Sequence, residues 1–409
     1  MKGVSFKEAF LFWLKLGFIS FGGPAGQIAI MHEYLVERKK WISESKFLHA
    51  LNYCMLLPGP EAQQLATYMG WLMHGSLGGI VAGLLFILPS VFILLALSCI
   101  YIVYGNTALL TGFFTLLKPA VAAVILLAVY KIANRALKNT TDYVVMAADL
   151  VALLIFHVAY PLIIITTVLL GVINAFRAKV DNNTSGQLTS TSTLSLRKAG
   201  VTLLIFLLLW ALPFILFRLC SSDVPFWDKL ALFFTQNAFI TFGGAYGILL
   251  YVSQVAVTKL QWLTQSQMLD GLALGESTPG PLIMVLTFVA FMGAYNHTGS
   301  LALASAGLFT ATFYTFLPSF AFILLGAPLV ERTHNDATWG KVLRYVTAAV
   351  VAVIANLFFV MLAAIYKQTN GTDLLPFLWV LLSVFALHRF NINMIIWLLL
   401  SGLAGIILY

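Results

Sequence analysis

The sequence predicts an all-α polytopic membrane protein built from two homologous halves, with about 10–13 transmembrane helices, some of them discontinuous. Composition is the first of three observations behind this prediction. Of the 409 residues, 61% are hydrophobic and 9% are charged, and the mean hydropathy is +0.95. Soluble domains carry about 25% charged residues. Lipid must therefore cover most of the outside of this chain.

Apolar segments are the second observation, because they follow one another almost without a pause. They lie near 6–30, 47–75, 77–104, 108–134, 143–158, 160–176, 199–217, 228–256, 268–296, 300–327, 341–366, 374–388 and 391–408. A helix needs about 20 residues to cross the hydrocarbon core, so the shortest segments are expected to be short, tilted or partly re-entrant. For 47–75, a re-entrant hairpin is an alternative to a crossing.

An internal repeat is the third observation. Uncommon residues recur at a constant spacing of 221 positions: Phe18–Gly23 with Phe239–Gly244, Gly26 with Gly247, Trp41–Ser43 with Trp262–Thr264, Pro58–Pro60 with Pro279–Pro281, and Gly78 with Gly299. Leu88–Ser90 matches Leu317–Ser319 after a small insertion. Shared hydrophobicity alone would not align Gly, Pro and Trp, so the pattern indicates a duplication, as in many transporters.

A polar stretch rich in Ser, Thr and Asn, 178–197, separates the halves. It predicts a flexible linker. The expected division is a first repeat over 1–177, the linker plus a connecting transmembrane segment over 178–225, and a second repeat over 226–409.

Orientation follows from the number of crossings. Six per half and one connecting segment would make the halves inverted repeats, with the N-terminus inside and the C-terminus outside. The net charge of +8 resides mainly in loops and segment ends, as the positive-inside rule expects, and gives no reason to invoke nucleic acid. By this count the basic cluster Arg38–Lys40 falls outside, against the rule.

Glycine and proline interrupt the apolar segments in matched pairs. The interruptions are Gly22, Gly23 and Pro24; Pro58, Gly59 and Pro60; Gly243 and Gly244; and Pro279, Gly280 and Pro281. Proline is tolerated in the first turn of a helix, so Pro24 and Pro60 are each predicted to open a half-helix. Helix starts carry unpaired N–H groups and partial positive charge, which bind anions. The alternative is that these residues merely kink packed helices.

Polar side chains flank these breaks. Glu61 follows Pro60 directly, and Glu276 precedes the second Pro-Gly-Pro, so either acid is a candidate proton carrier. A carboxylate that complements a helix start is the alternative for Glu61. Gln27, Gln63 and Gln64 could donate to an oxyanion or satisfy carbonyls freed by the breaks.

Two cations are candidates for an anion path. Lys118 and Arg344 lie in apolar segments before similar Ala- and Val-rich runs. The alternative is that each side chain snorkels to the interface. No spacing of His or Cys indicates a metal site, and the three cysteines indicate neither a disulfide framework nor a redox centre.

These motifs resemble the chromate transporter family in its long, two-domain form. The most specific parts are the runs Phe21–Ile28 and Leu57–Gly70 and, in the second half, Thr241–Gly247 and Glu276–Val285. The resemblance implies efflux of chromate from a bacterial cell, across the inner membrane, driven by the membrane potential or the proton gradient and conferring chromate resistance. Chromate is similar to sulfate in shape and charge, so an oxyanion is implied more firmly than chromate itself.

Other function classes stay open on the residues alone. An anion channel or a carrier of sulfate or another oxyanion would need the same site. A membrane-bound reductase would need a flavin, haem or iron–sulfur site, and neither the cysteines nor any nucleotide fingerprint supports one. We therefore expect no enzyme activity and no cofactor, with the oxyanion, the lipid bilayer and a second copy in a homodimer as partners.

Overall fold

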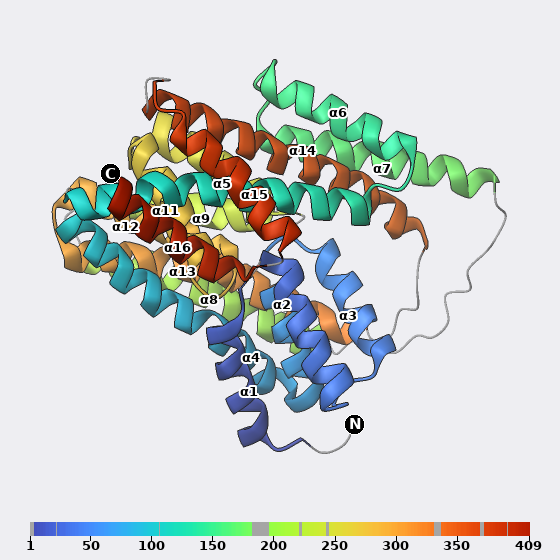
Figure 1. Cartoon of the computed structure of the whole chain (residues 1–409). Helices are drawn as coiled ribbons and strands as arrows, with labels where there is room; N and C mark the ends of the chain where they lie inside the picture. The colour runs from blue at the N-terminus through green and yellow to red at the C-terminus, as the bar shows by residue number, and fades with distance from the viewer. Residues whose placement is uncertain are drawn as a thin grey trace.

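The computed structural model describes residues 4–21, 23–105, 107–181, 196–220, 223–242, 245–330, 337–368, 372–390 and 392–409. The regular elements in these ranges are all helices (Figure 1). In chain order they are α1 (Phe6–Ile19), α2 (Gly23–His32), η1 (Glu33–Arg38), α3 (Glu44–Leu56), α4 (Glu61–Tyr104), α5 (Ala108–Ala136), α6 (Thr140–Leu154), α7 (Tyr160–Asp181), α8 (Leu196–Cys220), α9 (Val224–Ile240), α10 (Ala245–Gln254), η2 (Val255–Lys259), α11 (Gln265–Ser277), η3 (Leu282–Met284), α12 (Val285–Thr298), α13 (Leu301–Val330), α14 (Ala337–Gln368), α15 (Leu375–Arg389) and α16 (Met394–Leu408).

Five of the described helices are long and apolar enough to cross a bilayer. They are Glu61–Tyr104, Ala108–Ala136, Gly200–Leu219, Leu301–Ala327 and Arg344–Gln368. Four further apolar helices are shorter, at Tyr160–Asn174, Leu282–Thr298, Leu375–Arg389 and Met394–Leu408. The chain is therefore a multi-pass membrane protein, with fewer full-length spans than its apolar segments.

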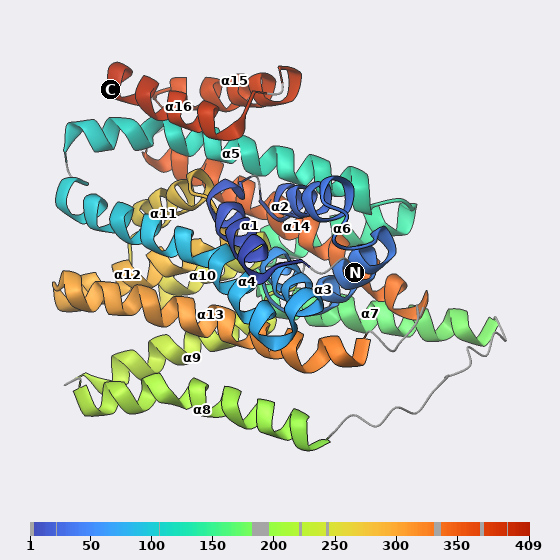
Figure 2. The ribbon, with the colours of Figure 1, turned by 90° about the horizontal axis from the view of Figure 1, so that it is seen from below.

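The outer helices present apolar faces that only lipid can cover. On α8 the exposed side chains include Leu204, Leu207 and Leu208. Figure 2 places α8 at one edge of the molecule and the pair α15–α16 at the opposite edge, against α5. Small residues allow that close approach, since a Cβ at Gly112 would lie 3.0 Å from the Gly405 carbonyl oxygen.

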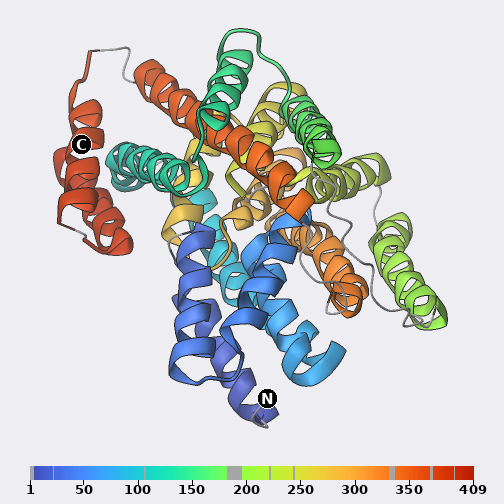
Figure 3. The ribbon, with the colours of Figure 1, turned by 90° about the vertical axis from the view of Figure 1, so that its right-hand side faces the viewer.

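The first apolar segment folds back on itself. The rings of Phe12 and Tyr34 stack at 4.1 Å between centroids, and Lys39 Nζ lies 2.9 Å from Glu8 Oε1. A continuous helix would separate Glu8 from Lys39 by about 46 Å. Thus α1 runs into the protein, the chain turns after Ile19, and α2 with η1 returns, so the expected single span over 6–30 is wrong. The N-terminal helices lie at the lower edge of Figures 1 and 3.

This reversal also corrects the position of the basic cluster. Arg38–Lys40 lies beside Glu8, at the end of the hairpin where the chain begins, rather than across the membrane from it. The conflict with the positive-inside rule came from counting 6–30 as a crossing.

A second hairpin follows in the first half. The rings of Tyr53 on α3 and Tyr68 on α4 lie 6.0 Å apart, although a straight helix would separate these residues by about 22 Å. The turn between the two helices is Pro58–Pro60. Non-helical backbone at His74 and Gly75 then reverses the chain again, inside the range of α4. The re-entrant alternative for 47–75 therefore describes this segment better than a straight span.

The second half contains the same two hairpins. Trp262, after η2, stacks on Phe234 of α9, so α10 with η2 folds back along α9. Asn296 of α12 donates to Gln267 of α11 at 3.3 Å, so these helices fold back around Pro279–Pro281. The expected straight spans over 228–256 and 268–296 are likewise wrong, because each turns at its glycine- or proline-rich break.

Candidate anion-binding site at the hairpin tips

Each of the four hairpins turns at a short segment between two helices, which we call its tip; the described tip residues are 20–21, 57–60, 241–242 and 278–281. Gly22, Gly243 and Gly244 were predicted as binding residues and lie outside the described residues. Of the described glycines, Gly23, Gly59 and Gly280 have φ of 71°, 121° and 97°. These are left-handed conformations that side chains with a Cβ rarely adopt.

The tips are joined in pairs across the two halves. The N–H of Gly59 donates to the Thr241 carbonyl at 2.6 Å, and the N–H of Gly280 donates to the Ser20 carbonyl at 2.7 Å. The spacing of 221 positions relates Gly59 to Gly280 and Ser20 to Thr241. The two bonds are therefore equivalent under the repeat, and each tip of one half rests on a tip of the other.

Two serines pack against the Pro-Gly-Pro tips that make these bonds. Ser90 Oγ donates to the Pro279 carbonyl, and a Cβ at Gly280 would collide with that hydroxyl. In the same way, a Cβ at Gly59 would collide with the hydroxyl of Ser319. Ser90 and Ser319 occupy the matched Leu-Pro-Ser positions. Both central glycines of the Pro-Gly-Pro motifs are thus required by close packing as well as by φ.

Four helix starts gather at these tips. α2 begins at Gly23, α4 at Glu61, α10 at Ala245, and the 3₁₀ turn η3 that leads into α12 begins at Leu282. Pro60 and Pro281 are the N-cap residues of α4 and η3, and neither start has a side-chain cap. Pro60 therefore precedes the helix rather than opening it. The first N–H groups of each start keep no partner within their helix and add partial positive charge.

Contacts of Tyr246 bring the two tip pairs together. Its hydroxyl oxygen would lie 3.8 Å from a Cβ at Gly23, and the hydroxyl hydrogen-bonds to the side chain of Glu276. Tyr246 belongs to α10, Gly23 to the start of α2 beside the first tip, and Glu276 to the helix that ends at the fourth tip. One side chain therefore touches three of the four hairpins.

The three glutamines lie fully buried around the tips, where they donate to protein acceptors. Gln27 Nε2 lies 2.6 Å from the Gly280 carbonyl, Gln64 Nε2 lies 2.7 Å from the Pro58 carbonyl, and Gln63 Nε2 lies 3.0 Å from Thr67 Oγ1. Gln27 and Gln64 thus satisfy carbonyls freed by the breaks, which is the alternative role that their positions allowed. Gln27 Nε2 also donates to the Ser20 carbonyl at 3.4 Å, so of the three amides those of Gln63 and Gln64 retain a second N–H.

Several buried polar atoms at the tips lack a hydrogen-bond partner among the described residues. They are Ser20 Oγ, Gln27 Oε1, Gln63 Oε1, Gln64 Oε1, both amide atoms of Asn237, Glu276 Oε1 and Ser319 Oγ. Protein interiors rarely leave such atoms unpaired. Their concentration at one place distinguishes the tips from ordinary helix packing.

Both predicted acids are buried beside the tips, with Glu61 9% and Glu276 5% exposed. Glu61 is the first residue of α4, and Glu276 is the second-last residue of α11. A carboxylate is stabilised by the partial positive charge at a helix start and destabilised by the partial negative charge at a helix end. The two acids thus occupy electrostatically different positions.

The two predicted cations are paired with carboxylates. Lys118 Nζ lies 2.8 Å from Asp270 Oδ1, with both side chains buried, and Tyr101 donates to Asp270 at 2.7 Å. Arg344 Nη2 lies 2.8 and 2.9 Å from the two Asp142 oxygens. These pairs offset the charge that an anion path would use.

The comparison with known protein families decides what kind of protein carries this site. The family model described as "Chromate transporter" matches residues 7–173 and 228–406. The chain belongs to the chromate transporter family. The two matched segments agree with two halves, and the family is one of transporters, not of enzymes.

Relatives in this family align over most of their length. A chromate transport protein of Pseudomonas aeruginosa is 31% identical over 98% of this chain and 92% of its own. A probable chromate transport protein of Synechococcus elongatus is 27% identical over 86% and 83%. A chromate transport protein of Cupriavidus metallidurans is 26% identical over 86% and 81%. No solved structure matches.

The sequence analysis did not predict several residues that lie at the tips of this chromate transporter. Ser90 and Ser319 could have been found, because they stand at matched positions of the repeat. Asn237 and Tyr246 gave no such signal, since their counterparts in the first half are Leu16 and Ala25. Asp270, the partner of Lys118, is likewise not repeated, because His49 stands at the matched position.

Proposed function

We propose that this chain is a secondary transporter of chromate, that it exports the anion, and that it binds the anion where the four tips meet. The supporting observation is the reciprocal pair of bonds, Gly59 to Thr241 and Gly280 to Ser20, which holds four helix starts around one place. Converging helix starts favour a tetrahedral dianion through backbone N–H groups and partial charge.

Hydrogen bonds and ion pairs within the protein limit which groups are left to bind the anion. The N–H groups of Gly59 and Gly280 already donate to carbonyls. We therefore assign the anion to the first turns of the helices that follow the tips and to the two glutamine amides that retain an N–H. Lys118 and Arg344 are left out of the proposed site, because each has a carboxylate partner. Sulfate, which shares charge and shape with chromate, is the expected competitor.

Alternating access would need the tip pairs to separate in turn. Each pair is held by a bond between the halves, so a relative movement of the halves could open one pair and keep the other closed. We therefore propose that the halves are inverted repeats, with 178–225 joining 1–177 to 226–409. A homodimer remains a prediction.

Proton coupling is assigned to the buried acids at the tips. Glu61 and Glu276 are the two buried carboxyls next to the proposed site, and an acid at membrane depth is a natural proton carrier. Protonation would remove the repulsion between a carboxylate and the incoming dianion.

Flux of labelled chromate in vesicles tests the proposal. The purified protein is reconstituted in known orientation, with sulfate as competitor and with or without an imposed proton gradient. Uphill movement driven by the gradient supports a coupled transporter. Flux that only dissipates the chromate gradient indicates a channel, and no flux of either anion would refute an oxyanion carrier.

A further inference from the structure

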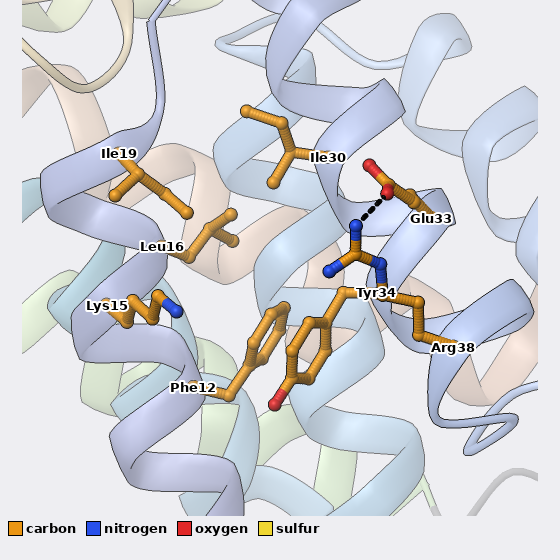
Figure 4. A pocket seen from close by; sticks show the side chains of 8 residues that line it. All are labelled: Phe12, Lys15, Leu16, Ile19, Ile30, Glu33, Tyr34 and Arg38. Atoms are coloured by element: carbon orange, nitrogen blue, oxygen red, sulfur yellow. Dashed lines mark hydrogen bonds and ion pairs between the residues drawn. The ribbon is translucent and has the colours of Figure 1, made fainter.

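A pocket of about 260 Å³ lies between the two legs of the first hairpin (Figure 4). The residues that line it come from α1, α2 and η1: Phe12, Lys15, Leu16, Ile19, Ile30, Glu33, Tyr34 and Arg38. Lys15 and Arg38 reach toward it from opposite legs. None of these residues belongs to the tips described above.

The pocket extends along the hairpin toward its tip. The stacked rings of Phe12 and Tyr34, with Arg38, lie toward the open end, and Ile19 and Ile30 lie nearest the turn. Ile19 directly precedes Ser20, whose carbonyl accepts the Gly280 N–H. The inner end of the pocket therefore adjoins the first tip, and Lys15 lies five positions before Ser20.

Lys15 is the free cation of this pocket. In the part of the chain that the structure describes, no ion pair or hydrogen bond engages its ammonium. Arg38 instead lies 2.6 Å from Glu33 and Lys39 lies 2.9 Å from Glu8. An exposed and unpaired ammonium attracts an anion without holding it tightly.

The matched hairpin of the second half has a pocket of about 380 Å³, whose lysine is Lys229 near the start of α9. At the constant spacing of the repeat, Gln236 stands for Lys15 and Val255 stands for Tyr34. Lys15 lies five positions before Ser20, whereas Lys229 lies twelve positions before Thr241, so the cation of the first hairpin lies closer to its tip. Such a difference gives the two approaches unequal affinity for an anion.

We infer that this pocket is the vestibule through which the oxyanion reaches the tips, with Lys15 as a staging cation on the side where transport begins. The inference rests on the proposed function and adds its sidedness. The open end of the first hairpin also carries Lys7, Lys40 and Lys46, and the positive-inside rule assigns such an end to the cytoplasm. Capture from the cytoplasm is what an exporter requires.

Kinetics of Lys15→Gln test the vestibule. The variant should raise KM for chromate about three- to tenfold at unchanged maximal rate, because only the approach of the anion loses an attraction. The parent's rate should also fall more steeply with ionic strength than the variant's. Lys15→Arg should restore the parent's KM. Lys7→Gln, on the same helix but outside the pocket, is the matched control and should change neither quantity.

Sidedness is the sharper readout. The effect on KM should appear when chromate is supplied from the side that carries the N-terminus, mapped with a protease-sensitive N-terminal tag, and should be absent from the other side. Unchanged kinetics in Lys15→Gln, or an equal effect from both sides, would overturn the vestibule while leaving the proposed transport intact. Absence of flux in the parent would instead remove the proposed function.

The phosphate of an anionic lipid headgroup is the other anion that would fit this pocket. A second experiment distinguishes it from the free oxyanion. Vesicles of phosphatidylcholine are compared with vesicles that also contain phosphatidylglycerol. If Lys15 attracts the free anion, the ratio of the variant's KM to the parent's KM is the same in both kinds of vesicle. If anionic lipid copurifies with the parent but not with Lys15→Gln, and the kinetic difference appears only in anionic vesicles, the free-anion assignment is wrong.

Discussion

The amide of Gly59 donates to the carbonyl of Thr241 at 2.6 Å, although the two residues lie in different halves of the chain. Its counterpart joins Gly280 to Ser20 at 2.7 Å. Each bond closes a contact between a Pro-Gly-Pro tip and a glycine-rich tip. A change in either pair should therefore affect the relation between the halves more than the stability of either half alone.

Replacing Gly280 by alanine should abolish chromate flux. The new Cβ would meet the Ser90 hydroxyl, and φ of 97° costs a residue with a Cβ about 1–2 kcal/mol. The double variant Gly280→Ala/Ser90→Ala should regain part of the flux, because it removes the clash but not the backbone strain. Gly200→Ala is the control, since no atom lies near that Cβ. Equal flux in Gly280→Ala and the parent would contradict the close packing of the tips.

Glutamine at position 61 should uncouple transport from the proton gradient. Glu61 is buried beside the tips, and the amide cannot carry a proton through the cycle. We expect chromate to move down its own gradient in Glu61→Gln but no longer uphill when a pH gradient is imposed. Glu37→Gln, an exposed acid on η1, is the control. If the pH gradient drives both variants like the parent, Glu61 only complements its helix start, and Glu276→Gln becomes the next test.

Lys118→Met should destabilise the protein by about 3–5 kcal/mol, because Asp270 would remain buried without its partner. Replacing both residues, as Lys118→Met/Asp270→Leu, should recover most of that loss. Thermal unfolding in detergent measures the difference. If the double variant is stable but its chromate flux is lost, the ion pair acts in transport as well, and its structural assignment is incomplete.

Cysteines at positions 12 and 34 should be joined efficiently by a short bifunctional thiol reagent. Their rings lie 4.1 Å apart between centroids, which requires α1 and α2 to be antiparallel. Leu11, whose side chain is exposed to the outside, replaces Phe12 in the control pair with Tyr34. Mass spectrometry of the linked peptides reads the result. Failure of the first pair to cross-link above the control would restore a straight span over 6–30.

Local patterns predicted much of the site but not its partners. The glycines and prolines marked all four breaks. Glycine has no Cβ and so adopts left-handed φ, and proline has no backbone N–H to donate within a helix. Gln27 and Gln64 were placed near the breaks, yet their use for the Gly280 and Pro58 carbonyls depends on how the tips pack. Lys118 and Arg344 were predicted as candidates for an anion path or as snorkelling side chains, because their carboxylate partners lie 152 and 202 positions away in the chain.

The sequence by itself determined the membrane class, the duplication, the family and the positions of the breaks, since all of these follow from composition and from motifs within a few residues. The tertiary structure decided whether each break continues a helix or reverses it. A helix interrupted by glycine and proline is free to do either, and the choice depends on distant contacts such as Phe12 with Tyr34 and Gln267 with Asn296. Other contacts between distant residues decided that tips of opposite halves pair, that Lys118 and Arg344 are each neutralised by a carboxylate, and that Lys15 has no partner among the described residues.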